Sequence, residues 1–188
     1  MTQKTHSPKN ELDATIAIDV LVGDEWKGIA VVEALVQECV RETIYVTCPA
    51  LLNDYELEVT VSLRGNDYVR ELNQKYLGKD KPTNVLSFAT NNDKNWSKKI
   101  TTPATMPLLL GDIILAYGIV SAEAKAQDKK LEDHVAHMVI HGCLHLLGHD
   151  HQEDSQANIM EGLERQILFG LGIGDPYSHE NSDLRAEQ

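Results

Sequence analysis

Apolar residues recur at every second position in several short stretches of the chain. In ELEVTVSLRG, leucine and valine alternate with polar residues, which predicts a strand with one face against the core. TIAIDVLV alternates near its start, whereas LLLGDIILAY is almost continuously apolar, as is typical of a buried strand. The four predicted strands are 15–22, 56–65, 85–90 and 108–117.

Apolar spacings of three and four residues predict helices between and after these strands. The five predicted helices are 25–44, 66–77, 118–128, 131–147 and 154–171. Asn66 is placed to cap the second of them. Four strands and about five helices predict an α+β fold with α/β-like layers, in which helices cover at least one face of a mixed sheet.

Length and composition indicate one domain. The chain has 188 residues, of which 42% are hydrophobic and 24% are charged, as in ordinary globular proteins. We expect a single domain over residues 14–174. The polar, aperiodic segments 1–13 and 175–188 are expected to be flexible.

The amino-terminal residues contain no apolar stretch typical of a signal peptide, and no apolar run approaches the ~20 residues that span a bilayer. We therefore expect a cytoplasmic protein. Cys39, Cys48 and Cys143 form no close-spaced pair, which argues against disulfides and a zinc ribbon. The net charge of −12 repels polyanions, so a nucleic-acid substrate needs a local basic patch.

Six of the eight histidines lie between residues 134 and 151. For the i, i+4 series His137, His141 and His145, a solvated helix face and a metal site are both open interpretations. His141 and His145 stand one above the other on a helix and can reach one ion. His137 lies about 12 Å from His145 along the axis, at about 1.5 Å per residue, which is too far to join them.

A third ligand becomes available where this helix ends. Gly148 is placed to end the helix in a left-handed conformation, after which the chain reverses and His151 can reach the same ion. The resulting H-x3-H-x2-G-x2-H is the spacing with which metzincin proteases bind zinc. We therefore expect a metal site at the end of a central helix. Gly142 stands where metzincins carry a glutamate base, and the lack of this glutamate disfavours peptide hydrolysis by the metzincin route.

Four stretches of the sequence together form a pattern that extends beyond the three histidines. They are GKDKPTNVLSF at 78–88, LLGDIIL at 109–115, AHMVIHGCLHLLGHDH at 136–151, and EDSQANIMEGLERQIL with the GDPY that follows. In this combination the chain resembles the bacterial YbeY-type endoribonucleases, zinc-dependent RNA-cleaving proteins linked to ribosomal RNA maturation. The resemblance implies that His141, His145 and His151 hold one Zn²⁺, although other divalent transition metals also suit imidazole ligands.

Two positions depart from the family pattern. His149 stands where the family usually has tyrosine, and a proton shuttle, an alternate ligand and a tolerated aromatic substitution are the open roles for it. Leu77 replaces an arginine that the family places just before GKDKPTN. Arg70, Lys79 and Lys81 are the nearby alternative sources of positive charge.

Phosphodiester cleavage needs proton transfer and stabilisation of negative charge. The candidate catalytic residues are Asp150, His149, Lys79 and Lys81. Asp150 is a candidate general base or an acceptor that orients a ligand, and stabilisation of the turn is its alternative role. The two lysines are a candidate phosphate clamp, and solubility of an exposed turn is the alternative.

Other polar residues near these motifs are expected to be structural or peripheral. Asn84 has phosphate binding and turn capping as open roles. We expect Asp112 to be a carboxylate buried in an apolar strand, either orienting a ligand or bonding a backbone turn. His134 and His137 are expected at the surface, and Cys143 in the core.

The leading hypothesis is a zinc-dependent endoribonuclease that hydrolyses single-stranded RNA in ribosomal RNA maturation and ribosome quality control. The expected partners are precursor ribosomal RNA and ribosomal proteins or other rRNA-processing factors, with no DNA and no membrane. The alternatives are a metallohydrolase of another substrate and a non-catalytic ribosome assembly factor with structural zinc.

Overall fold

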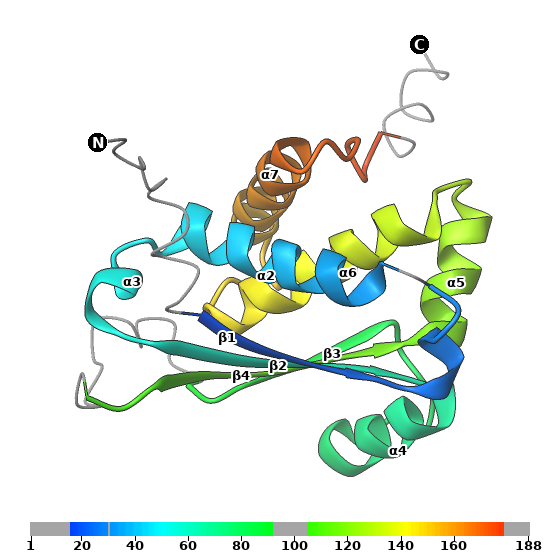
Figure 1. Cartoon of the computed structure of the whole chain (residues 1–188). Coiled ribbons are helices and arrows are strands. Elements are labelled where there is room, and N and C mark those ends of the chain that lie inside the picture. Colours follow the sequence, from blue (N-terminus) through cyan, green and yellow to red (C-terminus); the bar gives the residue numbers. More distant parts are fainter. Residues whose placement is uncertain (1–15, 30, 92–104, 179–188) are drawn as a thin grey trace, which may run out of the picture.

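The computed structural model describes residues 16–29, 31–91 and 105–178. It contains one four-stranded sheet, and Figure 1 shows helices on both faces of this sheet. The strands are Ile16–Val22 (β1), Leu57–Arg64 (β2), Val85–Ala89 (β3) and Leu108–Ala116 (β4). The helices are Val32–Thr47 (α2), Leu51–Asp54 (α3), Asn66–Leu77 (α4), Tyr117–Ala126 (α5), Leu131–Leu146 (α6) and Asp154–Gly170 (α7). The predicted α+β class is confirmed.

The sheet is mixed, in the strand order β1-β2-β4-β3. β1, β2 and β4 are parallel, whereas β3 runs antiparallel to β4 and forms one edge of the sheet. Parallel neighbours need a long crossover connection, and α2 is part of the one between β1 and β2. The edge position of β3 leaves one side of this strand free to line a cleft.

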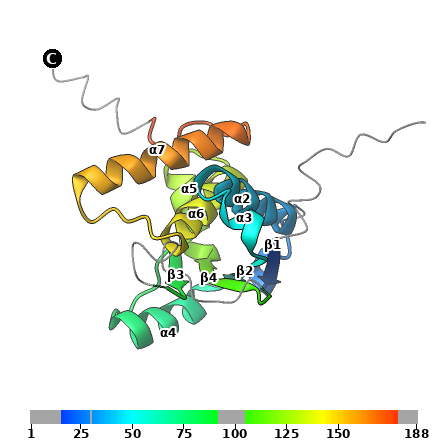
Figure 2. The same cartoon turned by 90° about the vertical axis from the view of Figure 1, so that its left-hand side faces the viewer.

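The main core lies between the sheet and the helices α2 and α6. The alternating apolar residues of β2 are all buried there, as their period predicts: Leu57, Val59, Val61 and Leu63. α6 lies between the sheet and α7 (Figure 2). Because both sides of α6 are covered, most of its residues are buried.

The opposite face of the sheet packs on α4. The buried residues of this smaller cluster are Val69, Leu86, Ile114 and Ala116. Asp112 faces the same side, because it lies two residues before Ile114 in β4, but it is exposed. The prediction of a buried carboxylate at Asp112 is therefore wrong, since α4 does not cover this part of the strand.

The segment before α2 differs from the prediction. α2 begins at Val32 rather than at residue 25, and a short 3₁₀ turn covers Asp24–Trp26. Trp26 is fully buried, and its indole N–H donates to the carbonyl of Arg64 at 3.0 Å, which ties this segment to the end of β2. α2 also ends three residues later than predicted, at Thr47, and the four-residue helix α3 is absent from the prediction. The bounds of α4, α5, α6 and α7 agree with the prediction within two residues.

Of the two predicted terminal segments, only the carboxy-terminal one is partly within the described residues. Segment 1–13 and residues 179–188 lie outside them. Residues 175–178 are described, and the Tyr177 side chain contacts Glu164 of α7. Within the described ranges, no helix combines the length and apolar character needed to cross a bilayer.

Candidate metal centre

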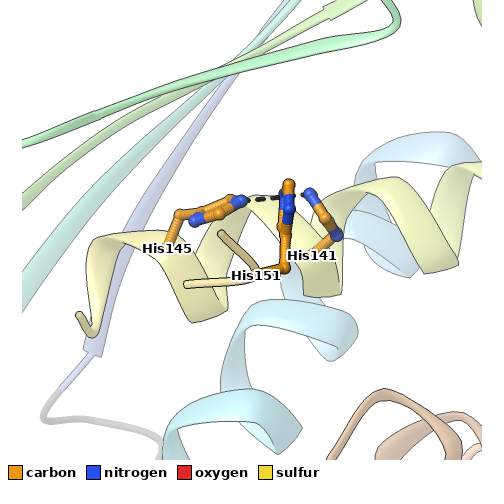
Figure 3. A group of neighbouring side chains, drawn as sticks. All are labelled: His141, His145 and His151. Carbon is orange, nitrogen blue, oxygen red and sulfur yellow. Dashed lines mark hydrogen bonds between the residues drawn. The ribbon is translucent and has the colours of Figure 1, made fainter. Parts of the chain in front are cut away.

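His141 and His145 lie in the last turns of α6, where a cap turns the chain back beside them. Gly148 has a left-handed φ of 88°, as predicted. Its N–H donates to the His145 carbonyl at 3.0 Å, and the His149 N–H donates to the Leu144 carbonyl at 3.0 Å, the pairing of a Schellman motif. The reversal brings His151 next to the two helical histidines (Figure 3).

Hydrogen bonds determine which nitrogen of each helical imidazole faces the other ring. His141 Nδ1 lies 2.8 Å from the carboxylate Oε1 of Glu164, and His145 Nδ1 lies 3.0 Å from the carbonyl oxygen of His149. A carboxylate and a carbonyl only accept hydrogen bonds, so both Nδ1 atoms carry the hydrogen. In the neutral rings, both Nε2 atoms therefore present lone pairs.

These two Nε2 atoms are 3.1 Å apart and are joined by the dashed line in Figure 3. Two lone pairs at this distance repel each other unless a proton or a metal ion lies between them. Tetrahedral zinc with Zn–N bonds of about 2.0 to 2.1 Å places neighbouring nitrogens about 3.3 Å apart. One ligand atom from each of His141, His145 and His151 lies within 4.8 Å of the other two. The donor set therefore fits a metal ion with three protein ligands.

The protonation of the ligand set also suits a metal. Burial, followed by the nearby His141 and His151, lowers the pKa of His145 to about 4. Burial lowers the pKa of His149 as well. His145 is therefore neutral at pH 7, as an imidazole ligand must be.

Gly142 faces the sheet and not the three clustered histidines. A Cβ added at Gly142 would lie 2.7 Å from Ile113 Cγ2, 3.0 Å from Ser87 Oγ and 3.3 Å from Val85 Cγ2. A side chain at this position would have to push α6 away from β3 and β4. The metzincin glutamate has no room here, which gives a packing reason for its absence.

His134 and His137 are buried, with relative exposures of 3% and 8%, so the prediction of surface positions is wrong. Neighbouring helices cover this side of α6. His134 Nε2 lies 2.9 Å from Glu123 of α5, and His137 Nε2 lies 3.2 Å from Glu164 of α7. Each imidazole is thus paired with a carboxylate. Cys143 is in the core, as predicted.

Glu164 is a site residue that the sequence analysis does not identify. It is 1% exposed and accepts hydrogen bonds from His137, His141 and Tyr177. Burial alone would raise the pKa of Glu164, but these hydrogen bonds outweigh it and lower the pKa to about 2. The sequence does hold a signal, because Glu164 occupies a position in the buried, otherwise apolar stripe of α7.

A cleft of about 720 Å³ opens beside the three histidines. β3 lines one side of it, and the turn that follows α6 lines the other. Two of the candidate catalytic residues, His149 and Asp150, are among the lining residues. Asp150 Oδ1 also accepts the His151 N–H at 2.8 Å, so the stabilising role in the turn is present.

The positive charges expected near the cleft lie elsewhere in the structure. Lys79 and Lys81 are exposed and do not line the cleft, and neither lysine nor arginine occurs among the described lining residues. Arg70 makes a bidentate pair with Asp80 at 2.6 and 3.0 Å. Leu77, at the position of the family arginine, is 54% exposed and lines the cleft.

Asn84 has a structural role in the turn before β3. Its Oδ1 accepts the Val85 N–H at 2.7 Å, and its Nδ2 donates to Glu123 at 3.1 Å. Both halves of the amide are therefore used within the protein.

Comparison with known proteins gives consistent matches. The family model described as Endoribonuclease YbeY matches residues 22–172. The Endoribonuclease YbeY of Dichelobacter nodosus is 54% identical over 124 residues, which are 66% of this chain and 74% of the relative. That of Zymomonas mobilis is 42% identical over 168 residues, 88% of this chain and 95% of the relative. The solution structure of TM1509 from Thermotoga maritima has 25% identity and a TM-score of 0.47, and the match covers 83% of this chain and 91% of that one.

Proposed function

Because this chain belongs to the YbeY endoribonuclease family, we propose that it matures ribosomal RNA by cleaving precursor RNA at a Zn²⁺ held by His141, His145 and His151. The chain is an endoribonuclease, a hydrolase of phosphodiester bonds, and RNA is its substrate. The observation that carries the choice of metal site is that one ligand atom from each of the three histidines lies within 4.8 Å of the other two, with the Nε2 lone pairs of His141 and His145 3.1 Å apart.

The mechanism we propose divides the chemistry between the metal and two side chains in the cleft. Zinc held by His141, His145 and His151 would supply Lewis acidity and would lower the pKa of water. Asp150 accepts a proton from the attacking water, and His149 relays this proton to the leaving ribose oxygen. Lys79 and Lys81, exposed in the turn after α4, contact phosphates that flank the cleaved bond.

The substrate we propose is single-stranded RNA. The cleft runs between an edge strand and a turn, a shape suited to one extended strand. The activity belongs to rRNA maturation and ribosome quality control in the cytoplasm, where ribosomal proteins or other rRNA-processing factors are its partners.

The test is incubation of the purified protein with ribosomal RNA, with and without a chelator, together with metal analysis. We expect cleavage that stops with the chelator and returns with zinc. Ribosomal RNA that stays intact with several divalent metals would refute the proposal.

Two variants separate the metal from proton transfer. Asp150→Asn keeps an Oδ1 that can accept the His151 N–H, so the turn is retained. We expect this variant to bind zinc and to cleave RNA on the order of 10²- to 10⁴-fold more slowly. His141→Ala is expected to lose zinc as well as activity.

A second candidate is a non-catalytic ribosome assembly factor with structural zinc. It is favoured by the lack of lysine and arginine among the described residues that line the cleft. His141→Ala discriminates, because unfolding on loss of the metal indicates structural zinc, and a folded, inactive variant indicates catalytic zinc. A peptide hydrolase is disfavoured by the packing of Gly142 against Ile113.

A further inference from the structure

Both carboxylate oxygens of Glu164 are occupied by donors from other parts of the chain. Oε1 accepts from His141 Nδ1 at 2.8 Å. Oε2 accepts from His137 Nε2 at 3.2 Å and from the Tyr177 hydroxyl. With a relative exposure of 1%, the carboxylate has no access to bulk water, and these three donors determine its orientation.

Tyr177 is itself held in place from several sides. Its ring meets the His137 ring edge-on at a centroid distance of 5.4 Å, and the Arg165 guanidinium carbon lies 4.7 Å from its centroid. Asp175 Oδ1 accepts the Tyr177 N–H at 2.9 Å and an Arg165 N–H at 3.3 Å. The segment after α7 therefore aims the hydroxyl at Glu164.

We propose that Glu164 and Tyr177 are positioning residues of the metal centre: Glu164 holds His141 with Nε2 toward the metal, and Tyr177 fixes Glu164. The proposal rests on the metal binding proposed above. A carboxylate that accepts from Nδ1 fixes the tautomer and ring orientation of an imidazole ligand and raises its basicity. By this reasoning, part of the segment 175–188 that the sequence assigned to a flexible tail belongs to the metal centre.

The chain contains a second histidine–carboxylate pair that serves as a matched control. His134 and Glu123 are 2.9 Å apart, and His134 lies on α6 as His141 does. His134 is not in the ligand set. Replacing Glu123 with glutamine thus removes the charge of a comparable pair without touching the three clustered histidines.

The experiment compares the wild type with Glu164→Gln, Tyr177→Phe and Glu123→Gln. The zinc dissociation constant of each is measured by competition with a chromophoric chelator, and the Tm of each metal-free protein is measured by circular dichroism. We expect Glu164→Gln to weaken zinc binding about 10- to 100-fold, the usual range for such partners. Tyr177→Phe should weaken it several-fold, and Glu123→Gln should stay within about twofold of the wild type.

The visible absorption of the Co²⁺-loaded proteins gives a second readout. A shift of the ligand-field bands in Glu164→Gln, and none in Glu123→Gln, is the expected result, because a general loss of stability does not alter the ligand geometry. If Glu164→Gln does not fold, the zinc affinity of Tyr177→Phe tests the positioning role instead, since this substitution keeps the ring and removes only the hydroxyl.

Two failures can be told apart. A wild type that binds no zinc or Co²⁺ overturns the proposed metal function. A wild type that binds zinc, with Glu164→Gln and Tyr177→Phe equal to it in affinity, overturns the positioning role alone.

Discussion

The close packing of Gly142 predicts that adding one methyl group at this position destabilises the protein. In Gly142→Ala the new Cβ would lie 2.7 Å from Ile113 Cγ2 and 3.0 Å from Ser87 Oγ. Both partners belong to strands of the sheet, and Ile113 is fully buried. The methyl group can fit only if α6 or the two strands move.

Two opposing effects set the size of this change. Overpacking of a core typically costs about 1 to 3 kcal/mol, whereas replacing glycine by alanine inside a helix gains up to about 1 kcal/mol. Subtracting the full helix gain leaves a net loss of up to about 2 kcal/mol, which lowers Tm by up to roughly 8 °C in a domain of this size. Gly162, on α7, is the matched control, because a Cβ there meets nothing within 4 Å.

The assay is urea unfolding of the metal-free wild type, Gly142→Ala and Gly162→Ala, so that metal binding does not contribute. Gly162→Ala should be more stable than the wild type by roughly 0.5 to 1 kcal/mol through helix propensity. Equal stabilisation by both substitutions would refute the inference that α6 presses on the sheet at Gly142, and with it the packing reason for the missing glutamate.

Three further predictions concern charge, protonation and thiol reactivity. Leu77→Arg places a cation on the cleft wall, so single-stranded RNA should bind more tightly. The slope of the logarithm of the RNA association constant against the logarithm of the salt concentration should steepen by about 0.7. The control is Leu109→Arg, outside the cleft lining, and equal RNA binding by the two variants would contradict the prediction. Burial lowers the pKa of His134, so the stability that the neutral imidazole contributes is complete above a pH of about 6.5 and is lost as the pH falls. The free energy of unfolding in urea should therefore depend less on pH, between about 7 and 5, in metal-free His134→Asn than in the metal-free wild type. Burial raises the pKa of Cys39 to about 12 and also raises that of Cys143. Both of these cysteines are buried, whereas Cys48 is partly exposed. A thiol reagent should therefore modify Cys48 first in the native protein, and equal rates of modification at all three cysteines would contradict the prediction.

The helices and strands can be predicted from the sequence wherever the local pattern of apolar residues and turns is enough to determine them. β2 alternates strictly, and α4 occupies the predicted residues 66–77 because apolar spacing and flanking turns agree. The helix predicted over 25–44 begins later in the structure because the hydrogen bond from Trp26 to Arg64, 38 residues away, holds the segment before it. Periodicity within a window cannot report such a contact.

The same distinction separates the three clustered histidines from the residues that contact them. His141, His145 and His151 lie within eleven residues, and Gly148 provides the reversal, so spacing is enough to predict the triad. Glu164 is 23 residues from His141, and Tyr177 is 40 residues from His137. The position of α7 over α6 brings them together, and that same packing buries His134 and His137.

The faces of α6 also narrow the choice of a general base. Gly142 is packed against the sheet, so no carboxylate can stand there. Glu164 reaches His141, but it is buried and its oxygens already accept from three donors. Among the described residues that line the cleft, Asp150 is the one carboxylate. A base that works on water beside His151 is therefore best sought at Asp150, on the turn that Gly148 creates, and not on the helix where metzincins carry it.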